Sequence, residues 1–137
     1  MSCILRVSGE FLDIDAMLSQ HKLSPYRTWK KGEARSLKGE VHSDCGASFI
    51  ASEADFDEFD CQVTDATTYL ELHVSAIARM AATTGVQFAV LDFGVFLNEG
   101  DVVQFCYFPP RLIQLAASAG IGIEVSQYVG SKDGSDG

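Results

Sequence analysis

The chain has 137 residues, of which 47% are hydrophobic and 21% charged, as in one ordinary globular domain. No apolar run approaches the roughly 18 residues needed to span a bilayer, so we expect no insertion into a membrane. A net charge of −9 disfavours nonspecific binding to nucleic acid phosphates.

The N-terminus and the cysteines indicate a cytoplasmic protein. The chain becomes polar after a short apolar run at its start and lacks the hydrophobic core of a secretory signal. The four cysteines are far apart in the sequence and form no Cys-x-x-Cys pair. We therefore expect reduced thiols at Cys3, Cys45, Cys61 and Cys106.

The first elements are a strand and a short helix. Residues 3–8 form an apolar run that Gly9 ends, which predicts an opening strand. Asp13 is suited to cap a helix near residues 14–22, and Pro25 prevents its continuation.

A long loop is predicted next, over residues 24–39, because this stretch has little apolar periodicity and contains Pro25, Gly32 and Gly39. Residues 47–51 then predict a strand, for which residues 40–43 are a candidate partner.

A long helix is predicted to begin at Asp55 and to run for about 28 residues until Gly85 stops it. Asp55 and Glu58 have the spacing of a capping box. Apolar or small residues follow at intervals of three and four, at Phe56, Phe59, Val63, Ala66, Leu70, Val74, Ile77 and Ala81.

The C-terminal part predicts three strands and a helix. Two strands, residues 86–93 and 102–108, are joined through a reversal at residues 98–101. Pro109 and Pro110 open a helix over residues 111–119, and a final strand follows over residues 121–128. Residues 130–137 contain only Gly, Ser and charged side chains, which predicts a flexible tail.

Together these elements predict a single α+β domain over residues 1–129. We expect a mixed sheet of about five strands, covered by one long and two short helices, in the order βαβαββαβ.

No pattern of catalytic or metal-binding residues accompanies this fold. The three histidines and four cysteines have neither zinc-ligand spacing nor a nucleophile signature, and no phosphate-binding glycine motif is present. The carboxylates between Asp55 and Asp60 are explained by the positive end of a helix dipole and lack the spacing of an EF-hand. We expect no metal ion and no cofactor, and no residue is assigned a catalytic role.

A cationic segment is the best candidate for a site. Six of the ten Lys and Arg residues lie between Lys22 and Lys38, together with the only tryptophan. Arginine binds carboxylate or phosphate through paired hydrogen bonds, and an aromatic ring adds a stacking surface. The candidate binding residues are Tyr26, Arg27, Trp29, Lys30, Lys31 and Arg35.

A second arrangement of the same segment stays open. Eight acidic residues and no Lys or Arg lie between Asp44 and Glu71, which supplies internal partners for the cations. In that case the cations pair with the acidic start of the long helix and Trp29 packs into the core, which is the arrangement that we favour.

Several phrases of the chain resemble a family of small bacterial proteins, domain of unknown function 4279. The phrases are Leu5-Arg6-Val7-Ser8-Gly9 with Leu12-Asp13, Pro25-Tyr26-Arg27-Thr28-Trp29-Lys30-Lys31-Gly32-Glu33, Leu91-Asp92-Phe93-Gly94, Tyr107-Phe108-Pro109-Pro110, and the closing strand over residues 121–128. The resemblance implies a compact mixed α/β protein from a bacterium or phage. It brings no reaction and no catalytic residue, and some members of such families serve as immunity proteins against toxins.

Three functions are compatible with these observations. The leading hypothesis is a noncatalytic binding protein, of an immunity-like kind, whose basic Trp-containing loop binds an acidic protein partner or a small anionic ligand. The second is an enzyme for a phosphorylated or carboxylated metabolite, with Arg27 and Arg35 holding the anion and His42 or Asp92 as base. The third is a structural homodimer formed through a sheet edge or an apolar helix face.

Overall fold

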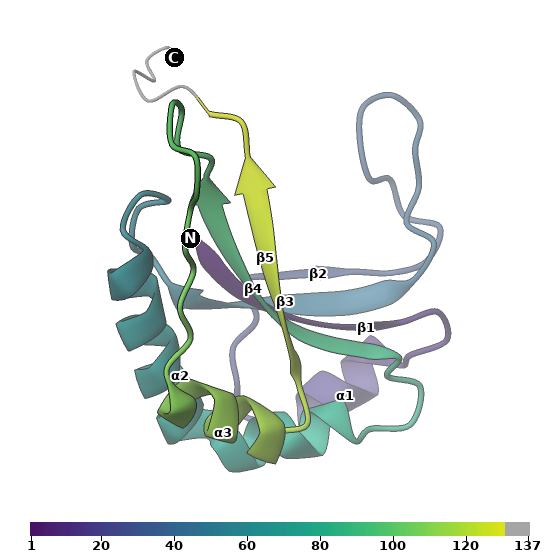
Figure 1. Ribbon diagram of the computed structural model, residues 1–137. Helices are drawn as coiled ribbons and strands as arrows, with labels where there is room; N and C mark the ends of the chain where they lie inside the picture. Colours follow the sequence, from purple (N-terminus) through teal and green to yellow (C-terminus); the bar gives the residue numbers. More distant parts are fainter. Residues whose placement is uncertain (131–137) are drawn as a thin grey trace.

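A computed structural model describes residues 1–130 and contains one five-stranded mixed sheet with three helices (Figure 1). The strand order is β2-β3-β1-β4-β5, and neighbours are antiparallel except for the parallel pair β4 and β5. The elements are β1 Cys3–Gly9, α1 Ile14–Gln20, β2 Arg27–Trp29, β3 Cys45–Ser52, α2 Phe59–Ala81, β4 Phe88–Phe96, α3 Pro110–Ser118 and β5 Gly122–Tyr128. This confirms the predicted α+β class with one long and two short helices. Residues 131–137, most of the expected flexible tail, lie outside the described residues.

The three helices lie on one face of the sheet, and no helix of residues 1–130 covers the other face (Figure 1). The alternation of side chains along the central strand β1 explains why only one face packs against helices. Its side chains alternate, so that Cys3, Leu5 and Val7 are fully buried against the helices. The intervening Ile4 and Arg6 point to the opposite, helix-free face, where they are only partly buried. We call this second surface the open face of the sheet.

Two strand predictions were wrong, although the number of strands was right. Arg27–Trp29 lies in the predicted loop but pairs with β3, and residues 102–108 form no strand. The order of elements along the chain is therefore βαββαβαβ. The physical reason is that a strand requires a hydrogen-bonded neighbour: β2 has one in β3, whereas residues 102–108 run over the surface towards α3 (Figure 1).

The candidate pairing of residues 40–43 with the third strand was also wrong. His42 N donates to the Glu33 carbonyl at 2.9 Å, and Arg35 N donates to the Glu40 carbonyl at 2.8 Å. A β-bridge joins Ala34 and Val41 between these two bonds. Residues 32–42 thus fold back on themselves and extend from the sheet as a narrow arm (Figure 1). We call them the 32–42 arm.

The helix ends follow the predicted caps in part. The Asp13 carboxylate accepts from Ala16 N at 3.0 Å, so α1 begins where expected. The long helix α2 begins at Phe59 and not at Asp55, because Glu58 N donates to the Asp55 carbonyl and closes a separate turn before it. No helix within residues 1–130 has both the length and the apolar character needed to cross a membrane.

Candidate functional site

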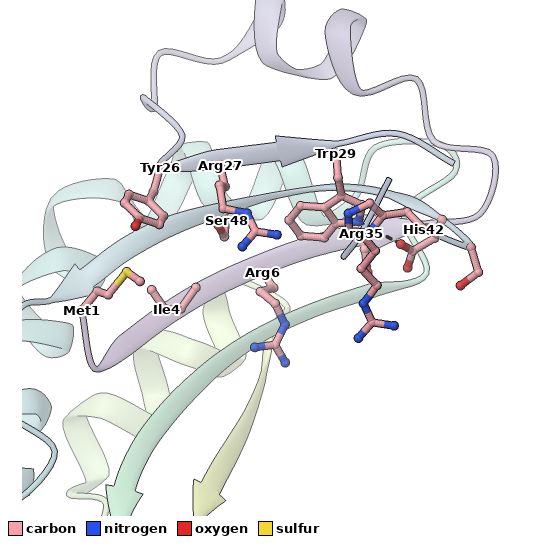
Figure 2. Close-up of a pocket in the computed structure, with 12 residues that line it drawn as sticks. Met1, Ile4, Arg6, Tyr26, Arg27, Trp29, Arg35, His42 and Ser48 are labelled. Atoms are coloured by element: carbon pink, nitrogen blue, oxygen red, sulfur yellow. Dashed lines mark hydrogen bonds between the residues drawn. The ribbon is translucent and has the colours of Figure 1, made fainter. Parts of the chain in front are cut away.

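The strand register aligns two arginines and a serine across the open face. Arg6 of β1 is directly opposite Ser48 of β3, and Ser48 is directly opposite Arg27 of β2. Adjacent strands lie about 4.8 Å apart, so Arg6 and Arg27 project from positions about 10 Å apart with the serine between them. We call these three residues the Arg27–Ser48–Arg6 row (Figure 2). Two guanidinium groups at this separation can contact one anion between them.

Arg6 is held in place by acidic residues of the neighbouring strands. Its Nη1 donates to Asp92 Oδ2 at 2.7 Å, and its Nη2 lies 3.5 Å from Glu124 Oε1. The other Asp92 oxygen accepts from Ser126 Oγ at 2.7 Å. The open face is therefore divided: acidic side chains lie on β4 and β5, and Arg6 marks the boundary with the basic half on β2 and β3.

Arg27 and Arg35 are not held by acidic residues in this way. Within the part of the chain that the structure describes, neither guanidinium forms an ion pair, and both residues are exposed. Arg27 extends from β2, and Arg35 is carried by the 32–42 arm. Two unpaired guanidinium groups near Arg6 give this half of the open face a positive field despite the acidic composition of the chain.

Trp29 lies beside the row and is half-buried. Its indole crosses β3 at Gly46, where an added Cβ would lie only 2.7 Å from Trp29 Cε2. The indole Nε1 donates to Asp44 Oδ1 at 2.9 Å. The His42 ring stacks on the indole with a centroid distance of 5.7 Å, and Arg27 Cζ lies 5.9 Å from the indole centroid. Trp29 is thus a fixed wall of the site and not part of the core.

These groups surround a pocket of about 440 Å³ on the open face (Figure 2). The pocket has three arginines, a histidine and two aromatic rings on its walls, with one carboxylate among them. The lining residues are Met1, Ile4, Arg6, Ser8, Tyr26, Arg27, Trp29, Arg35, His42, Ser43, Asp44 and Ser48. A pocket of this composition suits an anionic group with an apolar or planar part beside it.

Four of the six candidate binding residues line this pocket, namely Tyr26, Arg27, Trp29 and Arg35. The two lysines do not. Lys30 Nζ donates to Asp15 Oδ2 at 2.7 Å, and Lys31 Nζ donates to Glu10 Oε2 at 2.6 Å. The hydrogen bond and the charge of Asp15 raise the pKa of Lys30 above its ordinary value.

The internal arrangement predicted for the cations and Trp29 is therefore wrong in two respects. The acidic partners of the lysines come from α1 and the segment before it, and not from the start of α2. Trp29 packs on the open face and not in the core. The lysines fasten the basic segment to the rest of the fold, and the arginines are left to face the pocket.

Sequence reasoning missed Arg6 and Ser48 as members of the site. The available signal for Arg6 was the alternation along residues 3–9, which places Arg6 opposite to the buried Leu5 and Val7. No local signal places Ser48 beside it, because their juxtaposition depends on the pairing of two strands far apart in the sequence.

The two residues considered as bases in the enzyme hypothesis are separated by the fold. His42 lines the pocket and stacks on Trp29. Asp92 is buried beside Arg6 and Ser126 and does not line it. All four cysteines are free thiols. Within residues 1–130, no three His, Cys, Asp or Glu side chains are close enough to hold a metal ion.

The comparison with family models identifies the family of the chain. The model of a family described as a domain of unknown function (DUF4279) matches residues 1–130 of the 137. No curated protein and no solved structure matches the chain. The family match covers every element of the sheet and the whole pocket, so the chain belongs to the DUF4279 family.

Proposed function

We propose that this protein is a noncatalytic binding protein that holds an anionic group on the open face of its sheet. The bound group is a carboxylate or phosphate, presented by an acidic protein partner or by a small ligand. The observation that carries the proposal is the pair of arginines, Arg27 and Arg35, which face the pocket without an ion pair inside residues 1–130.

Each wall of the pocket has a part in this binding. Arg27 supplies the mobile end of the row, because its guanidinium is free to turn towards an anion and make two parallel hydrogen bonds. Arg6 supplies a positioned end, because Asp92 restrains one side of its guanidinium. Trp29 supplies an apolar surface for the part of the ligand next to the anionic group.

The cost of binding is reduced because the pocket is already assembled. Lys30 and Lys31 attach the basic segment to Asp15 and Glu10, and His42 closes over Trp29. An anion that enters between the arginines therefore orders few side chains, which is the condition for useful affinity from a small contact area.

The proposal extends to the cellular role. A binding face for anionic groups suits an immunity-like protein in the bacterial cytoplasm that covers an acidic surface of a toxin. Support for this extension comes from the resemblance to families some of whose members are immunity proteins, and from the free thiols of all four cysteines, as expected in a reducing compartment.

A second candidate function is an enzyme for a phosphorylated or carboxylated metabolite, and one observation favours it. His42 is the one histidine on the pocket wall, where it is positioned as a base beside a bound anion. Under this alternative a His42→Gln variant would keep anion binding and lose turnover, whereas a binding protein shows no turnover to lose.

The test is isothermal titration calorimetry of the full chain with two probes, inorganic phosphate and a hexaglutamate peptide. We expect at least one probe to bind with a Kd of roughly 1 mM or tighter, equivalent to about −4 kcal/mol. Arg27→Gln should weaken that Kd at least about tenfold, because a charged hydrogen bond contributes roughly 1.5–3 kcal/mol.

Lys38→Gln is the matched control. It removes one positive charge from the 32–42 arm at an exposed residue that does not line the pocket, so it should change the Kd little. If both variants weakened anion binding equally, the loss of affinity would follow from the change in net charge alone. That result would contradict a site at Arg27. Failure of both probes to bind would contradict the proposal as a whole.

A further inference from the structure

Residues 103–108 alternate like a strand although they lie outside the sheet, and Val102 before them is exposed as well. Val103, Phe105 and Tyr107 point to solvent with exposed fractions of 54%, 85% and 70%. The residues between them, Gln104 and Cys106, are partly buried, as is Phe108 at the end. Inward and outward side chains in strict alternation are the mark of extended backbone. We call residues 102–108 the surface segment.

The inward side chains hold this backbone in place. Gln104 Nε2 donates to the Phe96 carbonyl and Gln104 Oε1 accepts from Asn98 N, both at 2.9 Å. At the other end the Phe108 ring packs on Phe93 and Phe59 with centroid distances of 5.1 and 5.5 Å. Both ends are anchored to the fold, so the outward side chains are presented in a fixed arrangement.

The backbone of the surface segment is unpaired. Within residues 1–130, none of its amides or carbonyls takes part in a backbone–backbone hydrogen bond. A row of free donors and acceptors with apolar side chains beside it is a template for another strand. Proteins rarely leave such an edge uncovered, because it promotes association with other chains.

We propose that the surface segment pairs antiparallel with the same segment of a second copy of this chain. The register that the residues favour puts Phe105 opposite Phe105 on the two-fold axis and Val103 opposite Tyr107 of the second copy. Aromatic and β-branched pairs across antiparallel strands are stabilising, and both backbones gain the hydrogen bonds that each lacks alone.

Charge identifies a second copy as the occupant. The surface segment itself contains no charged residue, so two chains of net charge −9 meet where their repulsion is least. The segment is preceded by the acids Glu99 and Asp101 and followed by Arg111. Antiparallel pairing brings the acidic end of one copy to the Arg111 end of the other. Arg111 Nε already donates to Glu71 Oε2 at 3.0 Å, and the remaining N–H groups of this exposed guanidinium can take a second acidic partner.

This inference does not depend on the anion site, and its test is separate. Sedimentation velocity of the full chain over a range of concentrations should show a reversible species of twice the 14.8 kDa monomer mass. Phe105→Lys and, as a second variant, Tyr107→Lys should each raise the dimer dissociation constant at least about tenfold. Leu72→Lys is the control, because it alters an equally exposed apolar side chain on α2.

The charge pattern gives a further readout. The double variant Glu99→Lys with Asp101→Lys should weaken the dimer, and adding Arg111→Glu should restore it. Thermal melts identify a variant that fails through unfolding. A wild-type chain that stays monomeric, a larger closed assembly, or a dimer that persists in both lysine variants would each overturn the proposal.

Discussion

Substitution of Gly46 by alanine directly tests how Trp29 is positioned. A Cβ at this position would contact Trp29 Cζ2, lie 2.7 Å from Trp29 Cε2 and lie 2.9 Å from the Val7 carbonyl oxygen. Those separations are below van der Waals contact, and the carbonyl belongs to a central strand that cannot shift. The indole must therefore leave its place on β3.

The expected cost follows from overpacking, which is typically about 1–3 kcal/mol. Unfolding entropy is about 2.1 cal/mol/K per residue, so the chain of 137 residues has roughly 0.29 kcal/mol/K in total. Dividing the free-energy cost by this unfolding entropy predicts that Gly46→Ala lowers Tm by roughly 3–10 °C. It should also separate Trp29 Nε1 from Asp44 and open the wall of the pocket.

Thermal melts by circular dichroism and tryptophan fluorescence provide the assay, because Trp29 is the only tryptophan in the chain. We expect a lower Tm together with a red-shifted emission maximum. Gly122→Ala is the matched control: it is also a strand glycine of the same sheet, but nothing lies within 4 Å of its added Cβ. Its stability should be unchanged or raised by up to about 1 kcal/mol. If Gly46→Ala left the Tm and the emission maximum as unchanged as Gly122→Ala does, the packing of the Trp29 indole against Gly46 would be wrong.

Further predictions concern buried groups. Gln62 is fully buried and its Nε2 donates to the Gly94 carbonyl at 2.8 Å, so Gln62→Leu should lower the free energy of unfolding by about 1–3 kcal/mol in urea titrations; the exposed Gln114→Leu should change it little, and equal effects would refute the role of the Gln62 bond. Burial, with smaller contributions from Asp92 and Asp65, raises the pKa of the Cys3 thiol above its ordinary 9.0, and burial raises the pKa of Tyr69 to about 12. The unfolded chain releases these protons at lower pH than the native chain, so stability is full below about pH 9 and falls as the pH rises above it. Cys3→Ala should remove the earliest part of that fall, seen as a flatter plot of unfolding free energy against pH; an unchanged slope would contradict a protonated native thiol. Cys3 should also resist thiol reagents that modify the exposed Cys61 in the native protein.

Sequence patterns were sufficient to predict the helices, because helices are determined by residues close together in the sequence. The Asp13 cap, the three-and-four spacing of α2 and the prolines at the start of α3 each act within a few residues, and all three helices formed, although α2 begins four residues later than predicted. Residues 102–108 were predicted as a strand joined to residues 86–93 through the reversal at residues 98–101. That prediction was wrong because a local reversal cannot show that the residues after it have a hydrogen-bonded partner.

The site depended on pairings that no local pattern contains. β2 is only three residues long at the edge of the sheet, and its pairing with β3 is what turns Arg27 and Trp29 towards the pocket. The register of β1 on β3 then places Arg6 in the same row. The basic segment was identifiable from its charge, but the division between anchoring lysines and pocket-lining arginines required the acidic partners to be located in space.

A titration of the isotope-labelled chain with inorganic phosphate and with hexaglutamate, followed by NMR, tests the central claim most directly, because it locates the bound anion by residue. The account predicts that the largest shift changes occur at the backbone amides of Arg6, Arg27 and Ser48 and at the Trp29 indole N–H. They should saturate with one affinity and be lost in Arg27→Gln. Changes that cluster on α2 or around residues 102–108, or no changes at all, would contradict it.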